Sequence, residues 1–172
     1  MTTADRWAGR VDGGGTLASI LLATDGSSQA TMAARKAVAV SKGTGAELHV
    51  VHVWHPIPSP HYGGFIRREL EHQGREVLET AVRYAESIGG WVAGAHLVAG
   101  QSVEGILVVQ EETEADVVVA GSRGLGAIGR ALMGSVSTEL ARRAPCPVLV
   151  VHGEGKGFPV RENARVTERS TK

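Results

Sequence analysis

The part of the sequence best suited to binding chemistry is a glycine-rich run that begins at Gly121. Five glycines fall within the fourteen residues from Gly121 to Gly134, and Ser135 and Val136 follow directly. Glycines expose backbone N–H groups, and a helix that begins near Ser135 would add N-terminal donors and a dipole that favours an anion. A plain connection needs only about 2–6 residues. The run therefore predicts a phosphate-binding loop.

Two familiar phosphate-binding patterns do not explain this run. A Walker loop continues its second glycine with Lys-Ser/Thr, whereas here Gly126 is followed by Ala127-Ile128 and the lysine is absent. Residues 124–129 satisfy the spacing Gly-x-Gly-x-x-Gly, but they lie late in the chain rather than after a first strand. A Walker mechanism is therefore excluded, and the dinucleotide fingerprint is disfavoured.

A second polar segment, Thr24-Asp25-Gly26-Ser27, follows the first apolar run. Ser27 is placed to cap the next helix, because serine is among the preferred N-cap residues. Asp25 would lie at a strand tip, where its carboxylate can accept a hydrogen bond from a ribose hydroxyl or hold Mg²⁺. Formation of the turn itself is the alternative role for Asp25.

Histidine and cysteine give little evidence for a metal or a nucleophile. His49, His52 and His55 recur every three residues, but on a strand His49 and His52 point to opposite faces and cannot share an ion. Cys146 lies between two prolines with no histidine or lysine beside it, so we expect a buried structural thiol.

Short aliphatic runs alternate with longer segments that carry apolar residues at helical spacing. The predicted strands are residues 17–23, 47–53, 91–98, 116–120 and 148–151, and the predicted helices are residues 28–42, 65–88, 102–114 and 135–143. The fourth strand lacks polar alternation, as expected when both faces are covered. The pattern predicts an α/β domain with an open, doubly wound parallel sheet. Such sheets bind ligands beyond the carboxyl ends of their strands.

The sequence also resembles the universal stress protein family. Nucleotide-binding members carry Gly, two residues, Gly, nine residues, Gly and Ser/Thr, and this spacing is met by Gly121, Gly124, Gly134 and Ser135. The resemblance covers about residues 17–152, including the turn at residues 24–27. It implies a Rossmann-like five-stranded sheet in the order 3-2-1-4-5 with helices on both faces, an ATP-type ligand over strands one and four, and a homodimer that pairs the last strands, residues 148–151.

The same resemblance implies roles for individual residues. Asp25 would lie near the ribose and phosphates, and Val53 would line the adenine pocket. Ribose and phosphate would be held by Gly121, Gly124, Gly134, Ser135 and Val136. Thr24, Ser122 and Arg123 adjoin these positions and complete the expected site.

The residue types favour binding over turnover. Hydrolysis needs a placed water, a base and charge neutralisation, and Asp25 with Mg²⁺ and Arg123 or Arg130 are the only candidates in these loops. The leading expectation is an adenine-nucleotide-binding stress-response or regulatory protein, with ATP, ADP, AMP or cyclic AMP as its ligand and Mg²⁺ beside it. The alternatives are a slow ATPase or phosphotransferase that uses Asp25 and Mg²⁺, and a nucleotide-free interaction protein.

Composition sets the remaining bounds. Lys plus Arg and Asp plus Glu are each 18, so the formal net charge is zero, and aromatic residues make up 4%. Neither a global field nor a stacking surface supports binding to nucleic acid or a membrane. One cysteine and no apolar run of roughly 18 residues indicate a cytoplasmic protein. We expect flexible tails at residues 1–15 and 153–172 around one domain, residues 16–152.

Overall fold

The computed structural model describes residues 17–57, 63–122 and 133–153 of the chain. Strands and helices alternate within these ranges, as the sequence predicts. In chain order they are β1 (Ser19–Ala23), α2 (Ser28–Thr44), β2 (Glu47–Trp54), α3 (Gly63–Ser87), β3 (Val92–Ala99), α4 (Ser102–Glu112), β4 (Val117–Gly121), α5 (Ser135–Arg143) and β5 (Val148–Val151).

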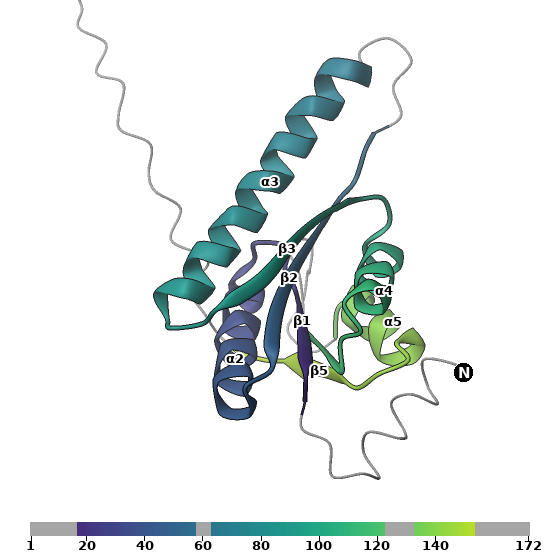
Figure 1. Ribbon diagram of the computed structural model, residues 1–172. Coiled ribbons are helices and arrows are strands. Elements are labelled where there is room, and N and C mark those ends of the chain that lie inside the picture. Colours follow the sequence, from purple (N-terminus) through teal and green to yellow (C-terminus); the bar gives the residue numbers. More distant parts are fainter. Residues whose placement is uncertain (1–16, 58–62, 123–132, 154–172) are drawn as a thin grey trace, which may run out of the picture.

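The strands form one parallel sheet in the order β3-β2-β1-β4-β5, which confirms the predicted topology (Figure 1). β1 occupies the centre, and all five of its residues are buried. It pairs with β2 on one side and with β4 on the other, so that Ala23 lies opposite both Val51 and Ala120. β3 and β5 form the two edges of the sheet.

Helices cover both faces of the sheet and separate its core into two layers (Figure 1). Ile20 and Leu22 of β1 pack in the layer under α2 and α3, whereas Leu21 and Ala23 pack in the layer under α4 and α5. This alternation follows from the period of two along a strand. Each completely buried side chain of this size stabilises the fold by roughly 1.5–3 kcal/mol.

Every predicted boundary lies within two residues of the observed one, and the differences have local causes. α2 continues past residue 42 to Thr44, where Gly45 adopts a φ of 77° and its N–H donates to the Ser41 carbonyl at 2.8 Å. A left-handed glycine is a common helix C-cap. α4 ends at Glu112 rather than at residue 114, because Glu114 already has a positive φ of 49°.

Asp116 does not belong to β4, although the sequence places it at the start of that strand. Its side chain is buried, and Oδ2 accepts hydrogen bonds from the backbone N–H groups of Ala18 and Ser19 at 2.7 and 3.1 Å. These charge-assisted bonds fix the beginning of β1 against the beginning of β4.

None of the helices in the described ranges is long and apolar enough to cross a membrane. The predicted N-terminal tail, and all of the predicted C-terminal tail except Gly153, lie outside the described residues.

Candidate functional site

The loops that follow β1 and β4 start side by side at the carboxyl edge of the sheet. Ala23 and Ala120 are register partners, so Thr24 and Gly121, the last residue of β4, occupy neighbouring positions at this edge. The helices that come next along the chain, α2 and α5, begin on opposite faces of this edge (Figure 1). The predicted site residues from β1 and β4 are therefore brought together.

The loop after β1 is held by its own short side chains. Asp25 Oδ1 accepts from the Ser27 N–H at 3.0 Å, and Thr24 Oγ1 accepts from the Gly26 N–H at 3.3 Å. Gly26 has a φ of 80°, which the turn requires. Ser27 Oγ accepts from the Ala30 N–H at 3.2 Å, which confirms Ser27 as the N-cap of α2. Asp25 therefore shapes the turn, the alternative that the sequence left open.

His52 of β2 contacts this loop, a role that the sequence did not predict. Its Nδ1 lies 2.8 Å from the Thr24 carbonyl oxygen. A carbonyl only accepts, so Nδ1 is the protonated nitrogen of the neutral ring. Burial lowers the pKa of His52, against the opposing effects of the Thr24 carbonyl and Asp25. The ring is therefore neutral at pH 7 and fixes the backbone next to Asp25.

The last residue of β4, Gly121, and the first residue of the following loop, Ser122, pack tightly. A Cβ on Gly121 would lie 2.9 Å from two atoms of Gln29 and 3.1 Å from the Ala30 nitrogen, so the first turn of α2 requires glycine here. Ser122 is buried, and its Oγ donates to Gln29 Oε1 at 3.3 Å. The next two predicted site residues, Arg123 and Gly124, lie outside the described residues.

Hydrogen bonds bring the two ends of the glycine-rich run together. The Gly134 N–H donates to the Ser122 carbonyl at 2.7 Å, and Ser137 Oγ donates to the same carbonyl at 3.0 Å. Residues 122 and 134 are thus adjacent in space. α5 starts at this point, with Gly134 as its N-cap, and glycine supplies no side chain to accept from the first-turn N–H groups.

Ser135 and Val136 form the first turn of α5, where the sequence predicted them. Ser135 is exposed and Val136 is half-buried against the core layer under α4 and α5. Val53 of β2 packs into the same layer, one residue before the strand ends. Val53 and Val136 thus lie on one face of the sheet, and Val53 is near the carboxyl edge.

The same core layer also contains Cys146, whose burial raises the pKa of its thiol to about 11, as expected of a structural cysteine.

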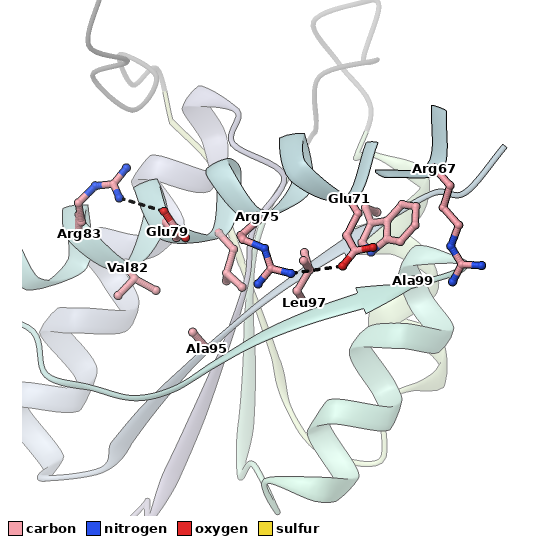
Figure 2. Close-up of a pocket in the computed structure, with 11 residues that line it drawn as sticks. Arg67, Glu71, Arg75, Glu79, Val82, Arg83, Ala95, Leu97 and Ala99 are labelled. Carbon is pink, nitrogen blue, oxygen red and sulfur yellow. Dashed lines mark hydrogen bonds and ion pairs between the residues drawn. The ribbon is translucent and has the colours of Figure 1, made fainter. Parts of the chain in front are cut away.

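A groove elsewhere on the molecule contains no residue of the predicted site (Figure 2). It has a volume of about 660 Å³ and lies between α3 and the edge strand β3. Its rim carries the ion pairs Arg75–Glu71 at 3.3 Å and Arg83–Glu79 at 3.4 Å, which join successive turns of α3. Exposed pairs of this kind contribute roughly 0.3–0.5 kcal/mol each. The i,i+4 spacing of the charged residues was visible in the sequence, but the position of α3 beside β3 was not.

The described residues offer no cluster of three or more His, Cys, Asp or Glu side chains for a metal ion. Mg²⁺ in nucleotide sites is usually held by one or two carboxylates together with the phosphates. The donor set at the strand tip, with Asp25 as its carboxylate, therefore fits a metal that arrives with a nucleotide and does not fit a resident one.

A family model for the universal stress protein family matches residues 17–152 of this sequence. The chain belongs to the universal stress protein family. It is 39% identical over 137 residues to a universal stress protein of Thermus aquaticus, which covers 77% of this chain and 97% of the relative. It is 34% identical over 158 residues to a universal stress protein of Mycobacterium tuberculosis and spans about half (52%) of that longer chain.

Solved universal stress proteins share the fold. One, described as a complex with cAMP, has a TM-score of 0.63 at 24% identity and covers 80% of this chain and 98% of its own. Another, from Archaeoglobus fulgidus in complex with dAMP, has a TM-score of 0.60 at 23% identity and covers 78% of this chain and 98% of its own. At these identities the likeness supports the arrangement of strands and helices.

Proposed function

We propose that this universal stress protein binds an adenine nucleotide at the carboxyl edge of the sheet, between β1 and β4, and acts as a regulatory protein. One observation carries the proposal: the bond from Gly134 N–H to the Ser122 carbonyl closes the glycine-rich run and leads directly into α5. The first turn of α5 therefore begins next to Ser122 at the end of β4, and the N–H donors of such a helix start suit a phosphate.

The surrounding residues fit the other parts of a nucleotide. The first-turn N–H groups of α5 and the Ser135 hydroxyl would donate to phosphate oxygens. Asp25, in the loop that follows β1, would accept from a ribose hydroxyl or bind Mg²⁺ through the phosphates. Val53 would contact the adenine ring from the face under α4. Arg123 and Gly124 are assigned to the same site by the sequence motif alone.

ATP is the proposed ligand, and AMP-type nucleotides are its competitors. Two structural neighbours are described as complexes with cAMP and dAMP, so the adenine nucleoside is the shared part. The glycine spacing in this chain matches the motif that the family's ATP-type binders carry. The described parts of the loops after β1 and β4 contain one carboxylate and no lysine. We therefore propose binding without fast hydrolysis.

Native mass spectrometry of the protein as purified, followed by calorimetric titration, tests this proposal. We expect a retained mass of an adenine nucleotide or, after its removal, uptake of ATP with Mg²⁺. Failure to bind ATP, AMP and cyclic AMP at millimolar concentration would contradict it. Phosphate release that is proportional to protein and absent from Asp25→Ala would instead support the slow ATPase.

We also propose a homodimer through β5. This strand lies at one edge of the sheet, and its Leu149 side chain is 40% exposed. Apolar edge strands are usually covered by pairing with another chain. Sedimentation analysis checks this: a dimer is expected at micromolar concentration, and a monomer that persists at all concentrations would contradict the proposal.

A further inference from the structure

Two histidine rings from neighbouring strands meet on the face of the sheet that α4 covers. His49 Nδ1 of β2 lies 3.3 Å from His96 Nε2 of β3, and the ring centroids are 5.5 Å apart at an angle of 42°. The register pairs His49 with Gly94 and His96 with Val51, so the two histidines are diagonal neighbours on one face. The pair lies far below the carboxyl edge of the strands and outside the proposed nucleotide site.

The separation of the two nitrogens suits a shared metal ion. Imidazole nitrogens bind Zn²⁺ at about 2.0–2.1 Å, and two such bonds at a tetrahedral angle place the nitrogens about 3.3 Å apart. The same distance suits a hydrogen bond between the rings, and a metal ion would take the place of the proton shared by the two nitrogens. Gly94 matters here, because a Cβ at that position would lie 2.7 Å from His49 Nδ1 and 3.0 Å from His96 Nε2. Any other residue would block approach to both nitrogens.

The surroundings of the pair resemble the outer shell of a metal site. Glu47 Oε2 lies 3.6 Å from His49 Nε2, the nitrogen that faces away from His96. A carboxylate on the second nitrogen of a metal-bound histidine fixes the ring and raises its basicity. Burial, followed by the neighbouring His49, lowers the pKa of His96, against the opposing effect of Glu112.

We propose that His49 and His96 form a two-histidine site for a divalent transition metal of the Cu²⁺, Ni²⁺ or Zn²⁺ class. Imidazole ligands select these ions over Mg²⁺ and Ca²⁺. No third His, Cys, Asp or Glu in the described part of the chain completes the group, so water molecules fill the remaining positions. With two protein ligands from the described residues, the site has modest affinity, in contrast to a closed structural zinc site.

The test uses the full-length protein, nucleotide-free, with Cu²⁺ and Zn²⁺ as probes. Competition against a chelator should show that each chain binds one metal ion. The substitution His49→Gln or His96→Gln should weaken the affinity for that ion at least about tenfold. His72→Gln is the matched control, since His72 is 66% exposed on α3 and should leave the affinity unchanged. Equal affinity in His96→Gln and the parent would overturn the proposal.

Two spectroscopic measurements on the unaltered protein keep the proposal testable if a variant fails to fold. The paramagnetic resonance spectrum of bound Cu²⁺ should show two coordinating nitrogens. In nuclear magnetic resonance, substoichiometric Ni²⁺ should broaden the ring signals of His49 and His96 before those of His52 and His72. A spectrum with one nitrogen, or first broadening at another histidine, would contradict the site.

Discussion

α2 and α5 start at the same edge of the sheet, yet their N-termini are satisfied differently. α2 is capped by the Ser27 side chain, and the preceding turn is fixed by Asp25 and by His52. α5 is preceded by Gly134, which has no side chain to cap the first-turn N–H groups; the Ser137 and Thr138 hydroxyls donate instead to the Gly134 carbonyl. Helix N-terminal donors need partners, from side chains, water or a ligand.

The difference indicates which helix start is built for a ligand. At α2 the chain supplies its own acceptors, so an anion there would have to displace Ser27. At α5 the donors adjoin the glycine-rich run and have no internal competitor among the described side chains. We therefore expect changes at the start of α5 to alter nucleotide binding, and changes at the start of α2 to alter stability.

The largest effect is expected from Gly134→Asp. The new carboxylate would cap α5 from within and place a negative charge where the phosphate is proposed to bind, while the observed φ of −64° and ψ of 158° at Gly134 are open to any residue. The loss of two charge-assisted hydrogen bonds at about 1.5–3 kcal/mol each predicts a loss of affinity of at least about a hundredfold. Calorimetric titration with ATP measures it, and thermal melting should show an unchanged or higher Tm. Parental affinity in the folded variant would contradict the role of α5.

Ser135→Ala is expected to have the next largest effect. It removes one hydroxyl donor to a charged phosphate, worth about 1.5–3 kcal/mol, but leaves the backbone donors in place. The affinity for ATP should fall roughly ten- to a hundredfold. Ser135 is exposed, so the free energy of unfolding without ligand should not change. A variant that loses stability and keeps its affinity would reverse our assignment of the two helix starts.

Ser27→Ala tests the other side of the comparison. Loss of the bond from Ala30 N–H should lower the free energy of unfolding by about 1 kcal/mol, as N-cap substitutions usually do. The dissociation constant for ATP should change by no more than about threefold, less than the loss of one hydrogen bond. Chemical denaturation and titration of the same preparation give both values. A tenfold loss of affinity would show that α2 also binds the ligand.

The smallest effect concerns pH and His52. Burial lowers the pKa of His52 in the folded state below its ordinary value of 6.5, so the unfolded chain binds the proton more tightly. The resulting stability is fully present above pH 6.5 and is lost as the pH falls through the folded-state pKa. His52→Gln retains a donor for the Thr24 carbonyl and should reduce the loss of stability between pH 7.5 and pH 5. Denaturation at both pH values measures this, and an unchanged difference would contradict it.

Local signals in the sequence were enough to predict the strands, the helices and both helix starts, whereas the sheet order came from the family resemblance. Ser27 as a cap depends only on its residue type and the apolar spacing that follows it. The turn role of Asp25 was one of two alternatives, and the contact with Ser27 confirms it, while the ligand role stays part of the proposal.

Contacts between strands could not be predicted in the same way. His49 and His96 are 47 residues apart, and their meeting depends on a register shift between Leu48 and His49 that no local pattern encodes. The contact between His52 and Thr24, and the packing that requires glycine at residue 121, also depend on neighbours that are distant in the chain. The sequence therefore identified the elements correctly and missed the side chains that connect them.

The central position of β1 provides an internal standard for hydrogen exchange. β1 pairs on both sides and is buried along its whole length, so amides such as those of Leu21 and Leu22 exchange only when the domain unfolds globally. Amides in the first turn of α5 lie at the surface and exchange through local opening. One exchange experiment with and without nucleotide thus separates local ordering at the ligand from overall stabilisation of the domain. Protection gained at residues 135–136 beyond that gained in β1 measures local ordering at the ligand, and equal gains measure the overall stabilisation of the domain.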